Sequence, residues 1–131
     1  MSKEIVNCFY EYATNGRFAE ALALFSTQAH ISFYGPASVP HSGEYHGVEG
    51  LQTFFTIVGG TLDVLAFEPL EFIAEGERVV VLGRERSRVK GTGREFSVQW
   101  VQVWTVEQQK IVRLRDYFDT GTMAEAFAAA L

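Results

Sequence analysis

One carboxylic acid falls on an otherwise apolar face of an expected strand. In segment 111–119 the even positions are Val112, Leu114, Asp116 and Phe118, and strand alternation places them on one face. Burying an unpaired carboxylate costs free energy, so its pKa rises or it acquires a partner. The pattern therefore predicts that Asp116 is a general acid or base or contacts a ligand. The alternative is a structural acid bonded to backbone donors or to an arginine.

A second acid is predicted to share this surface. In segment 79–88 the even positions 84, 86 and 88 are arginines, which favours a solvated or interface face for them. The opposite face then carries Glu85 and Ser87, unless a one-residue bulge turns Glu85 outward. If Glu85 and Asp116 lie within several ångströms, repulsion raises at least one pKa. We therefore predict Asp116 and Glu85 as the catalytic residues.

The strand expected at 98–106 adds aromatic and amide groups. One face carries Trp100, Gln102 and Trp104, and aromatic walls with a polar group are typical of ligand sites. Gln102 either bonds a ligand carbonyl or satisfies Asp116. The opposite face, with Val101 and Val103, is then free for subunit contact together with the arginines. The predicted substrate-binding residues are Gln102, Trp100, Trp104, Phe33, Phe9, Tyr12, Phe118, Leu114 and Ser87.

Composition limits the possible functions. A chain of 131 residues indicates one domain spanning 1–131, and a net charge of −5 disfavours nucleic-acid binding. The single cysteine excludes an internal disulfide and suits a reducing cytoplasm. No apolar run reaches the length of a membrane span. The three histidines lack the spacing of a metal site, so we expect no bound metal.

The order of the expected elements predicts an α+β fold. Helices come first and an antiparallel meander of strands follows, which favours helices packed on one face of a curved sheet around a conical cavity. Ser2 is a plausible N-cap for the first helix, and Thr122 begins a capping box for the last. The expected helices are an N-terminal one ending at 15–16, then 18–25, 49–58 ended by Gly59-Gly60, and 123–131. The expected strands are 29–35, 67–74, 78–89, 95–106 and 111–119, with a loop at 36–47 whose His41 and His46 border the cavity mouth.

These segments together resemble the nuclear transport factor 2-like superfamily. Within it, the chain is similar to the SnoaL-like polyketide cyclase and ketosteroid isomerase-like branch. The resemblance lies in Phe18…Ala21-Leu22…Leu24-Phe25, Gly43-Glu44-Tyr45-His46-Gly47-Val48-Glu49-Gly50…Phe54-Phe55, Thr92-Gly93-Arg94-Glu95-Phe96, Trp100-Val101-Gln102-Val103-Trp104 and Lys110-Ile111…Arg113…Arg115-Asp116-Tyr117-Phe118-Asp119. The resemblance implies a cone-shaped α+β barrel that binds small apolar or steroid-like molecules without a cofactor. It also implies a homodimer formed through the sheet.

Only some of the relatives' catalytic residues have a counterpart of the same type in this sequence. The isomerases' proton-shuttling aspartate aligns with Phe33, their oxyanion tyrosine with Phe9, and their second oxyanion acid near Gln102. True ketosteroid isomerase chemistry is therefore not expected. In the limonene epoxide hydrolase-like relatives only the last aspartate matches, at Asp116, whereas Glu85 takes the arginine position. The polyketide cyclases resemble this chain in using a single pocket acid on the final strand, which Asp116 matches.

The functional expectation is a cofactor-independent enzyme of the isomerase, cyclase or lyase type. Asp116 would act as general acid and base on an apolar carbonyl-bearing or polycyclic substrate, and Gln102 would donate to the developing oxyanion. The alternative is a non-catalytic carrier of an apolar ligand, or a dimeric adaptor of the same fold. The expected partners are a small molecule and a second copy of the chain, without nucleic acid or membrane.

Overall fold

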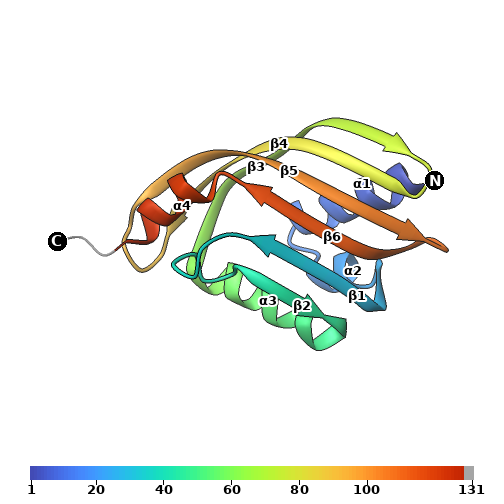
Figure 1. The fold of residues 1–131 in the computed structure, drawn as a ribbon, viewed down its shortest axis with the longest axis horizontal. Coiled ribbons are helices and arrows are strands. Elements are labelled where there is room, and N and C mark those ends of the chain that lie inside the picture. Colours follow the sequence, from blue (N-terminus) through green and yellow to red (C-terminus); the bar gives the residue numbers. More distant parts are fainter. Residues whose placement is uncertain (129–131) are drawn as a thin grey trace.

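The computed structural model describes residues 1–128 and contains four helices and a six-stranded sheet (Figure 1). The helices are α1 (Ser2–Thr14), α2 (Phe18–Leu22), α3 (Gly47–Thr61) and α4 (Thr120–Phe127). The strands are β1 (Phe25–Tyr34), β2 (Gly43–His46), β3 (Leu62–Glu75), β4 (Arg78–Val89), β5 (Glu95–Glu107) and β6 (Lys110–Phe118). Within residues 1–128, every helix is too short or too polar to span a bilayer.

The sheet is curved and open, with strand order β2-β1-β6-β5-β4-β3. Strands β3 to β6 form the predicted antiparallel meander. Strand β1 pairs with β6 in parallel, and β2 adds an antiparallel edge strand in the segment expected to be a loop. Pro69 lies in β3, the opposite edge, where a residue without an N–H is tolerated.

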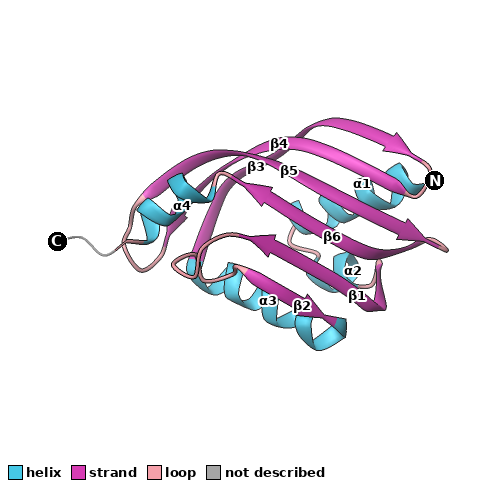
Figure 2. Ribbon diagram, viewed as in Figure 1, coloured by secondary structure: helices cyan, strands magenta, loops and turns pink. Residues whose placement is uncertain are grey.

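Helices cover one face of the sheet, which we call the inner face. Figures 1 and 2 show α1, α2 and α3 behind the curved strands, with the other, outer face turned to the viewer. Alternate residues of β4 and β5 are buried on the inner face, among them Val79, Val81 and Trp104 at 0% exposure. The predicted α+β class is therefore confirmed, although the sheet is not closed into a barrel.

Strand parity is correct along β4 and β5 but fails at the start of β6. The pairing of β5 with β6 shifts register between Thr105 and Val106, so that Val112 is an additional residue on β6. Ile111 is consequently fully buried, whereas Val112 is only half-buried. The prediction that Val112 shares the face of Leu114 and Asp116 is wrong, because a bulge displaces the two-residue alternation.

Several predicted helix boundaries also differ from the structure, and α2, for example, ends at Leu22 instead of at residue 25. Met1, not Ser2, is the N-cap of α1, and the Ser2 hydroxyl instead donates to the Gly76 carbonyl oxygen. Helix α3 continues through Gly59-Gly60 to Thr61, since glycine weakens a helix without necessarily ending it. Helix α4 begins before the predicted capping box, because Asp119 caps it by accepting a hydrogen bond from the Thr122 N–H. Residues 129–131 of that predicted helix lie outside the described residues.

Candidate functional site

Asp116 is buried at the centre of the inner face, as the strand pattern predicts. Only 2% of Asp116 is exposed to solvent. In the sheet, Asp116 on β6 pairs with Phe33 on β1 and with Gln102 on β5. Two adjacent strands therefore hold this carboxyl group from both sides.

A chain of hydrogen bonds leads from helix α1 to Asp116. The Gln102 Nε2 amide donates to Asp116 Oδ1 at 2.7 Å, and the Tyr10 hydroxyl donates to Gln102 Oε1 at 2.5 Å. The Trp104 indole Nε1–H donates to the Tyr10 oxygen at 3.0 Å. All four side chains are buried. We call these four residues the inner relay.

The buried surroundings change the acidity of Asp116. Burial raises the pKa of Asp116 to about 7, against the opposing effect of the Gln102 hydrogen bond, and the negative charge of Glu85 raises it further. Near neutral pH, comparable amounts of the protonated and ionised forms are therefore present. A group with this property can both accept and donate a proton at the pH of a cell.

Glu85 faces inward from β4, as predicted. It is 6% exposed and pairs with Phe67 on β3 and Val98 on β5, and the shifts in register on β3 lie elsewhere. Burial raises the pKa of Glu85, and a 2.6 Å hydrogen bond from the Ser87 hydroxyl partly offsets this effect. The inner face therefore holds two interacting acids whose charged forms are disfavoured.

Trp100 forms an aromatic wall beside these acids. Its indole stacks on Phe67 at a centroid distance of 4.7 Å and an interplanar angle of 17°, and Phe118 lies 5.9 Å away. The indole lies over Gly83, where an added Cβ would be 2.3 Å from Trp100 Cζ2 and 2.5 Å from the Glu68 carbonyl oxygen. Glycine is thus required for this placement. Within residues 1–128, the buried Trp100 Nε1–H has no hydrogen-bond partner.

The two histidines predicted at a cavity mouth lie on opposite faces of the sheet. His41 is 2% exposed and packs against Phe33 at a ring distance of 4.4 Å. Burial lowers the pKa of His41 to about 4, so the ring is neutral at pH 7. His46 instead stacks on His30 at 3.9 Å on the outer face, so its predicted place beside the cavity is wrong.

Helix α1 presents Tyr10, a residue that sequence reasoning missed, to the inner relay. Phe9 packs against Trp104 at 5.0 Å, but Tyr10 is the residue that contacts Gln102. The sequence alignment placed the isomerases' tyrosine at Phe9, one residue before Tyr10, which makes the hydrogen bond to Gln102. Tyr12 lies two residues further round the helix, a rotation of about 200°, and its ring packs 4.9 Å from the Arg17 guanidinium. Val6 and Tyr10 lie four residues apart and share one buried face of α1.

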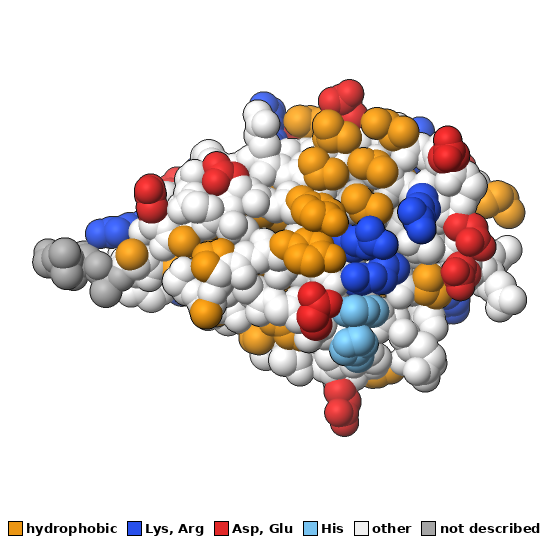
Figure 3. All heavy atoms as spheres, in the orientation of Figure 1, with side chains coloured by type: hydrophobic (Ala, Val, Ile, Leu, Met, Phe, Trp, Pro, Cys, Tyr) orange, Lys and Arg blue, Asp and Glu red, His pale blue; other side chains and the backbone are white. Residues whose placement is uncertain are grey.

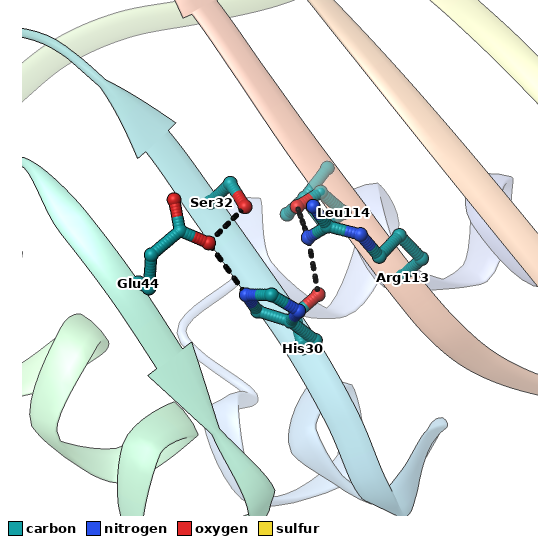
Figure 4. A network of polar contacts seen from close by, with 5 residues as sticks. All are labelled: His30, Ser32, Glu44, Arg113 and Leu114. Carbon is teal, nitrogen blue, oxygen red and sulfur yellow. Dashed lines mark hydrogen bonds and ion pairs between the residues drawn. The ribbon is translucent and has the colours of Figure 1, made fainter.

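A second polar network joins strands on the outer face (Figure 4). Glu44 Oε1 accepts a hydrogen bond from the Ser32 hydroxyl at 2.5 Å, and it also lies 2.6 Å from His30 Nε2. The Arg113 guanidinium donates to the His30 carbonyl oxygen at 3.3 Å. The Ser32 hydrogen bond is the main cause of a lowered Glu44 pKa. This network connects β2, β1 and β6, and it accounts for the polar side chains there without a ligand.

Two grooves of the described residues 1–128 run along strands β3, β4 and β5, and Asp116 lines neither. One, of about 660 Å³, is lined by Glu85 and by residues that include Glu68, Arg84, Arg86 and Gln99. The other, of about 330 Å³, is lined partly by Leu70, Leu82, Val101 and Tyr117. The predicted conical cavity on the inner face stays a prediction. Among residues 1–128, no three His, Cys, Asp or Glu side chains gather as metal ligands would.

The open curved sheet, helix-covered on one face and with an acid at its centre, defines the class of this domain. A family model, the SnoaL-like domain, matches residues 6–114. The chain belongs to the SnoaL-like family of the nuclear transport factor 2 (NTF2)-like superfamily.

Solved structures of similar proteins support the same fold. An NTF2-like protein from Burkholderia xenovorans LB400 is 30% identical, with 97% of this chain and 95% of that chain covered and a TM-score of 0.87. An NTF2-like protein from Burkholderia pseudomallei K96243 is 28% identical, with 98% of both chains covered and a TM-score of 0.89. TerC, co-crystallised with polyporic acid, is 24% identical, with 96% and 97% covered and a TM-score of 0.84. No curated protein matches the chain.

Proposed function

We propose that this protein is a cofactor-independent acid–base enzyme of the isomerase, cyclase or lyase type, with Asp116 as the proton-transferring group. The observation that carries this proposal is the buried carboxyl group whose pKa is about 7. Such a group exchanges protons at neutral pH without a metal or an organic cofactor. The small molecule in the TerC crystal supports a ligand-binding role for this fold.

The proposed substrate is apolar and carries a carbonyl group. Ionised Asp116 would take a proton from the carbon next to the carbonyl and, once protonated, return it to the substrate at another atom, so the protein ends in its starting state. Glu85 would act as the second acid of the pair. The surrounding side chains Phe33, Leu114 and Phe118 would supply apolar contacts, with Trp100, Phe9 and Ser87 also on the inner face.

Trp100 is a better candidate than Gln102 for the donor to the substrate oxygen. The Gln102 amide is already bonded to Asp116 on one side and to Tyr10 on the other. The buried Trp100 Nε1–H has no partner in the part of the chain that the structure describes, and an unsatisfied buried donor costs free energy that a ligand oxygen would recover. We therefore assign the oxyanion contact to Trp100.

The charge of the inner face favours a neutral substrate. It presents Glu85 and Asp116, whose ionised forms burial disfavours, and His41, which is neutral at pH 7. An anionic ligand would lose its hydration and be repelled by these acids when they are ionised. Neutral ketones and enones avoid both costs.

Deuterium exchange tests the proposal without knowledge of the natural product. Neutral ketones and enones would be incubated with the protein in D₂O, and loss of the proton beside the carbonyl would be followed by NMR. Asp116→Asn should lower the exchange rate about 10²- to 10⁴-fold. Glu44→Gln, which changes an acid on the outer face, is the matched control. Equal rates in wild type and Asp116→Asn would contradict the proposal.

A non-catalytic carrier is the second candidate, favoured by the departures from the family's catalytic positions at Phe33, Glu85 and Gln102. Mass spectrometry of the purified protein distinguishes the two. A bound apolar compound that is released unchanged after incubation, and whose protons do not exchange, would support the carrier.

Exposed apolar side chains on the outer face favour association of two copies of the chain into a homodimer. Exposed apolar side chains gather there, including Tyr34, Leu70, Ile73 and Tyr117 at 42–58% exposure, and Figure 3 shows the hydrophobic patch beside basic and histidine side chains. A patch of this kind is typical of an interface. Light scattering would detect the dimer, and Ile73→Asp should convert it to a monomer. A wild-type monomer at micromolar concentration would contradict this.

A further inference from the structure

We propose that Trp104, Tyr10 and Gln102 act in series as positioning residues that reserve Asp116 Oδ1 as a hydrogen-bond acceptor, which leaves Oδ2 as the oxygen that gains and loses the proton. This inference deepens the proposed function at the same carboxyl group. Its structural part, the assignment of the two oxygens, holds whether or not the protein is an enzyme.

The direction of the inner relay follows from Trp104. An indole N–H can only donate, so the Tyr10 oxygen must accept from Trp104. The single hydroxyl proton of Tyr10 is then directed to its other neighbour, Gln102, at 2.5 Å. The Gln102 atom that receives it must be the carbonyl oxygen Oε1, which turns the amide NH₂ toward Asp116.

The opposite orientation of the Gln102 amide is disfavoured at both ends. With Nε2 facing Tyr10, the tyrosine would accept from both neighbours and its own buried proton would have no acceptor. With Oε1 facing Asp116, two oxygens would meet unless Asp116 were protonated. The four side chains are at most 6% exposed to bulk solvent, so an unpaired group among them would be costly. The relay therefore selects one orientation.

The fixed amide makes the two oxygens of Asp116 unequal. Oδ1 accepts the Gln102 N–H at 2.7 Å, so a proton on Asp116 is placed on Oδ2. A substrate would then exchange its proton with Oδ2. Two titratable groups interact electrostatically with Asp116 across this site, namely Glu85 on β4 and Tyr10 on α1.

Removing the Tyr10 hydroxyl tests the relay directly. Tyr10→Phe releases the Gln102 amide, so the hydrogen bond that favours ionised Asp116 weakens and the Asp116 pKa should rise by about one unit. Trp104→Phe should raise it by less, since Tyr10 can still donate to Gln102. Tyr45→Phe is the matched control, because it removes a tyrosine hydroxyl that donates to the His41 carbonyl oxygen. The pKa is read from the ¹³C resonance of the Asp116 carboxyl group, without a substrate.

An unchanged Asp116 pKa in folded Tyr10→Phe, or an equal shift in Tyr45→Phe, would overturn the relay. If Tyr10→Phe does not fold, the wild-type Gln102 side-chain ¹⁵N and ¹H resonances decide instead. They should titrate with the same midpoint as Asp116, and an amide that does not respond would overturn the relay. A confirmed relay without deuterium exchange would contradict the enzyme proposal alone.

Discussion

Two carboxylates on opposite faces of the sheet accept the same kind of hydrogen bond and change acidity in opposite directions. On the inner face, the Ser87 hydroxyl donates to Glu85 at 2.6 Å, and the Glu85 pKa is raised. On the outer face, the Ser32 hydroxyl donates to Glu44 at 2.5 Å, and the Glu44 pKa is lowered. Glu85 is 6% exposed, whereas the Glu44 side chain is 50% exposed. Burial, rather than the serine, therefore decides the sign.

The same contrast separates two aspartates that are three residues apart. Asp119 lies at the end of β6 as the N-cap of α4, and hydrogen bonds from the Thr122 hydroxyl and backbone N–H lower its pKa. Asp116, inside the sheet, has its pKa raised to about 7. A short stretch of one chain thus carries a structural acid that stays ionised and a candidate catalytic acid that does not.

The largest predicted effect is a pH dependence of stability that comes from Asp116. Its folded pKa of about 7 exceeds the ordinary value of 3.8, so its contribution is fully present below pH 3.8 and is lost as the pH rises through 7. The full change is about 4 kcal/mol at 1.36 kcal/mol per pKa unit. Between pH 5 and pH 8, the free energy of unfolding in urea should fall by roughly 3 kcal/mol from this group.

Asp116→Asn removes the titrating group, so most of this fall between pH 5 and pH 8 should disappear. Asp119→Asn is the control, since asparagine also caps a helix and the group at 119 titrates at lower pH than the window. An equal pH dependence in wild type and Asp116→Asn would show that burial does not raise the Asp116 pKa.

Gly83→Ala should produce the next largest effect, because it forces a methyl group into the inner face. The new Cβ would overlap the Trp100 ring and the Glu68 carbonyl oxygen, and overpacking of this kind costs about 1–3 kcal/mol. Gly59→Ala is the matched control, since Gly59 lies in helix α3 and a new Cβ would meet no atom of residues 1–128 within 4 Å outside its own stretch of the helix. That control should stabilise the protein by about 0.5–1 kcal/mol. Urea unfolding measures the stability of both variants. An unchanged free energy of unfolding in Gly83→Ala would show that the Trp100 ring can move away from the new methyl group.

Among the exposed acids, Asp119→Ala should lower the stability of the protein through loss of the α4 N-cap. Asp119→Asn should retain most of that stability. Because the Asp119 pKa is lowered, its contribution is present at neutral pH and is lost as the pH falls through the folded pKa. Thermal unfolding at pH 7 checks the size, and a fully stable Asp119→Ala would show that Asp119 does not hold the helix end.

Local periodicity accounts for the parts of the site that the sequence predicted. The two-residue repeat of strands correctly placed Glu85, Ser87, Trp100 and Gln102 on the face of Asp116, because parity needs no knowledge of the partner strand. The α+β class followed from the order of helical and strand patterns in the same way.

The features that were missed depend on contacts between distant segments. Strand β2 and the parallel pairing of β1 with β6 join residues far apart in the chain, and the bulge at Val112 depends on the register with β5. Tyr10 was missed because adjacent helical positions 9 and 10 are both buried, and only the position of Gln102 shows which one reaches it.

The smallest predicted effect compares the two serine–glutamate pairs directly. Ser32→Ala should raise the Glu44 pKa toward its ordinary value, whereas Ser87→Ala should raise the Glu85 pKa further away from it. Each shift should be small, as expected for loss of one hydrogen bond to the charged form. The ¹³C resonances of the two carboxyl groups would measure both values in the same protein. A Glu85 pKa that falls in Ser87→Ala would mean that the serine, and not burial, raises it, and the contrast between the two faces would then fail.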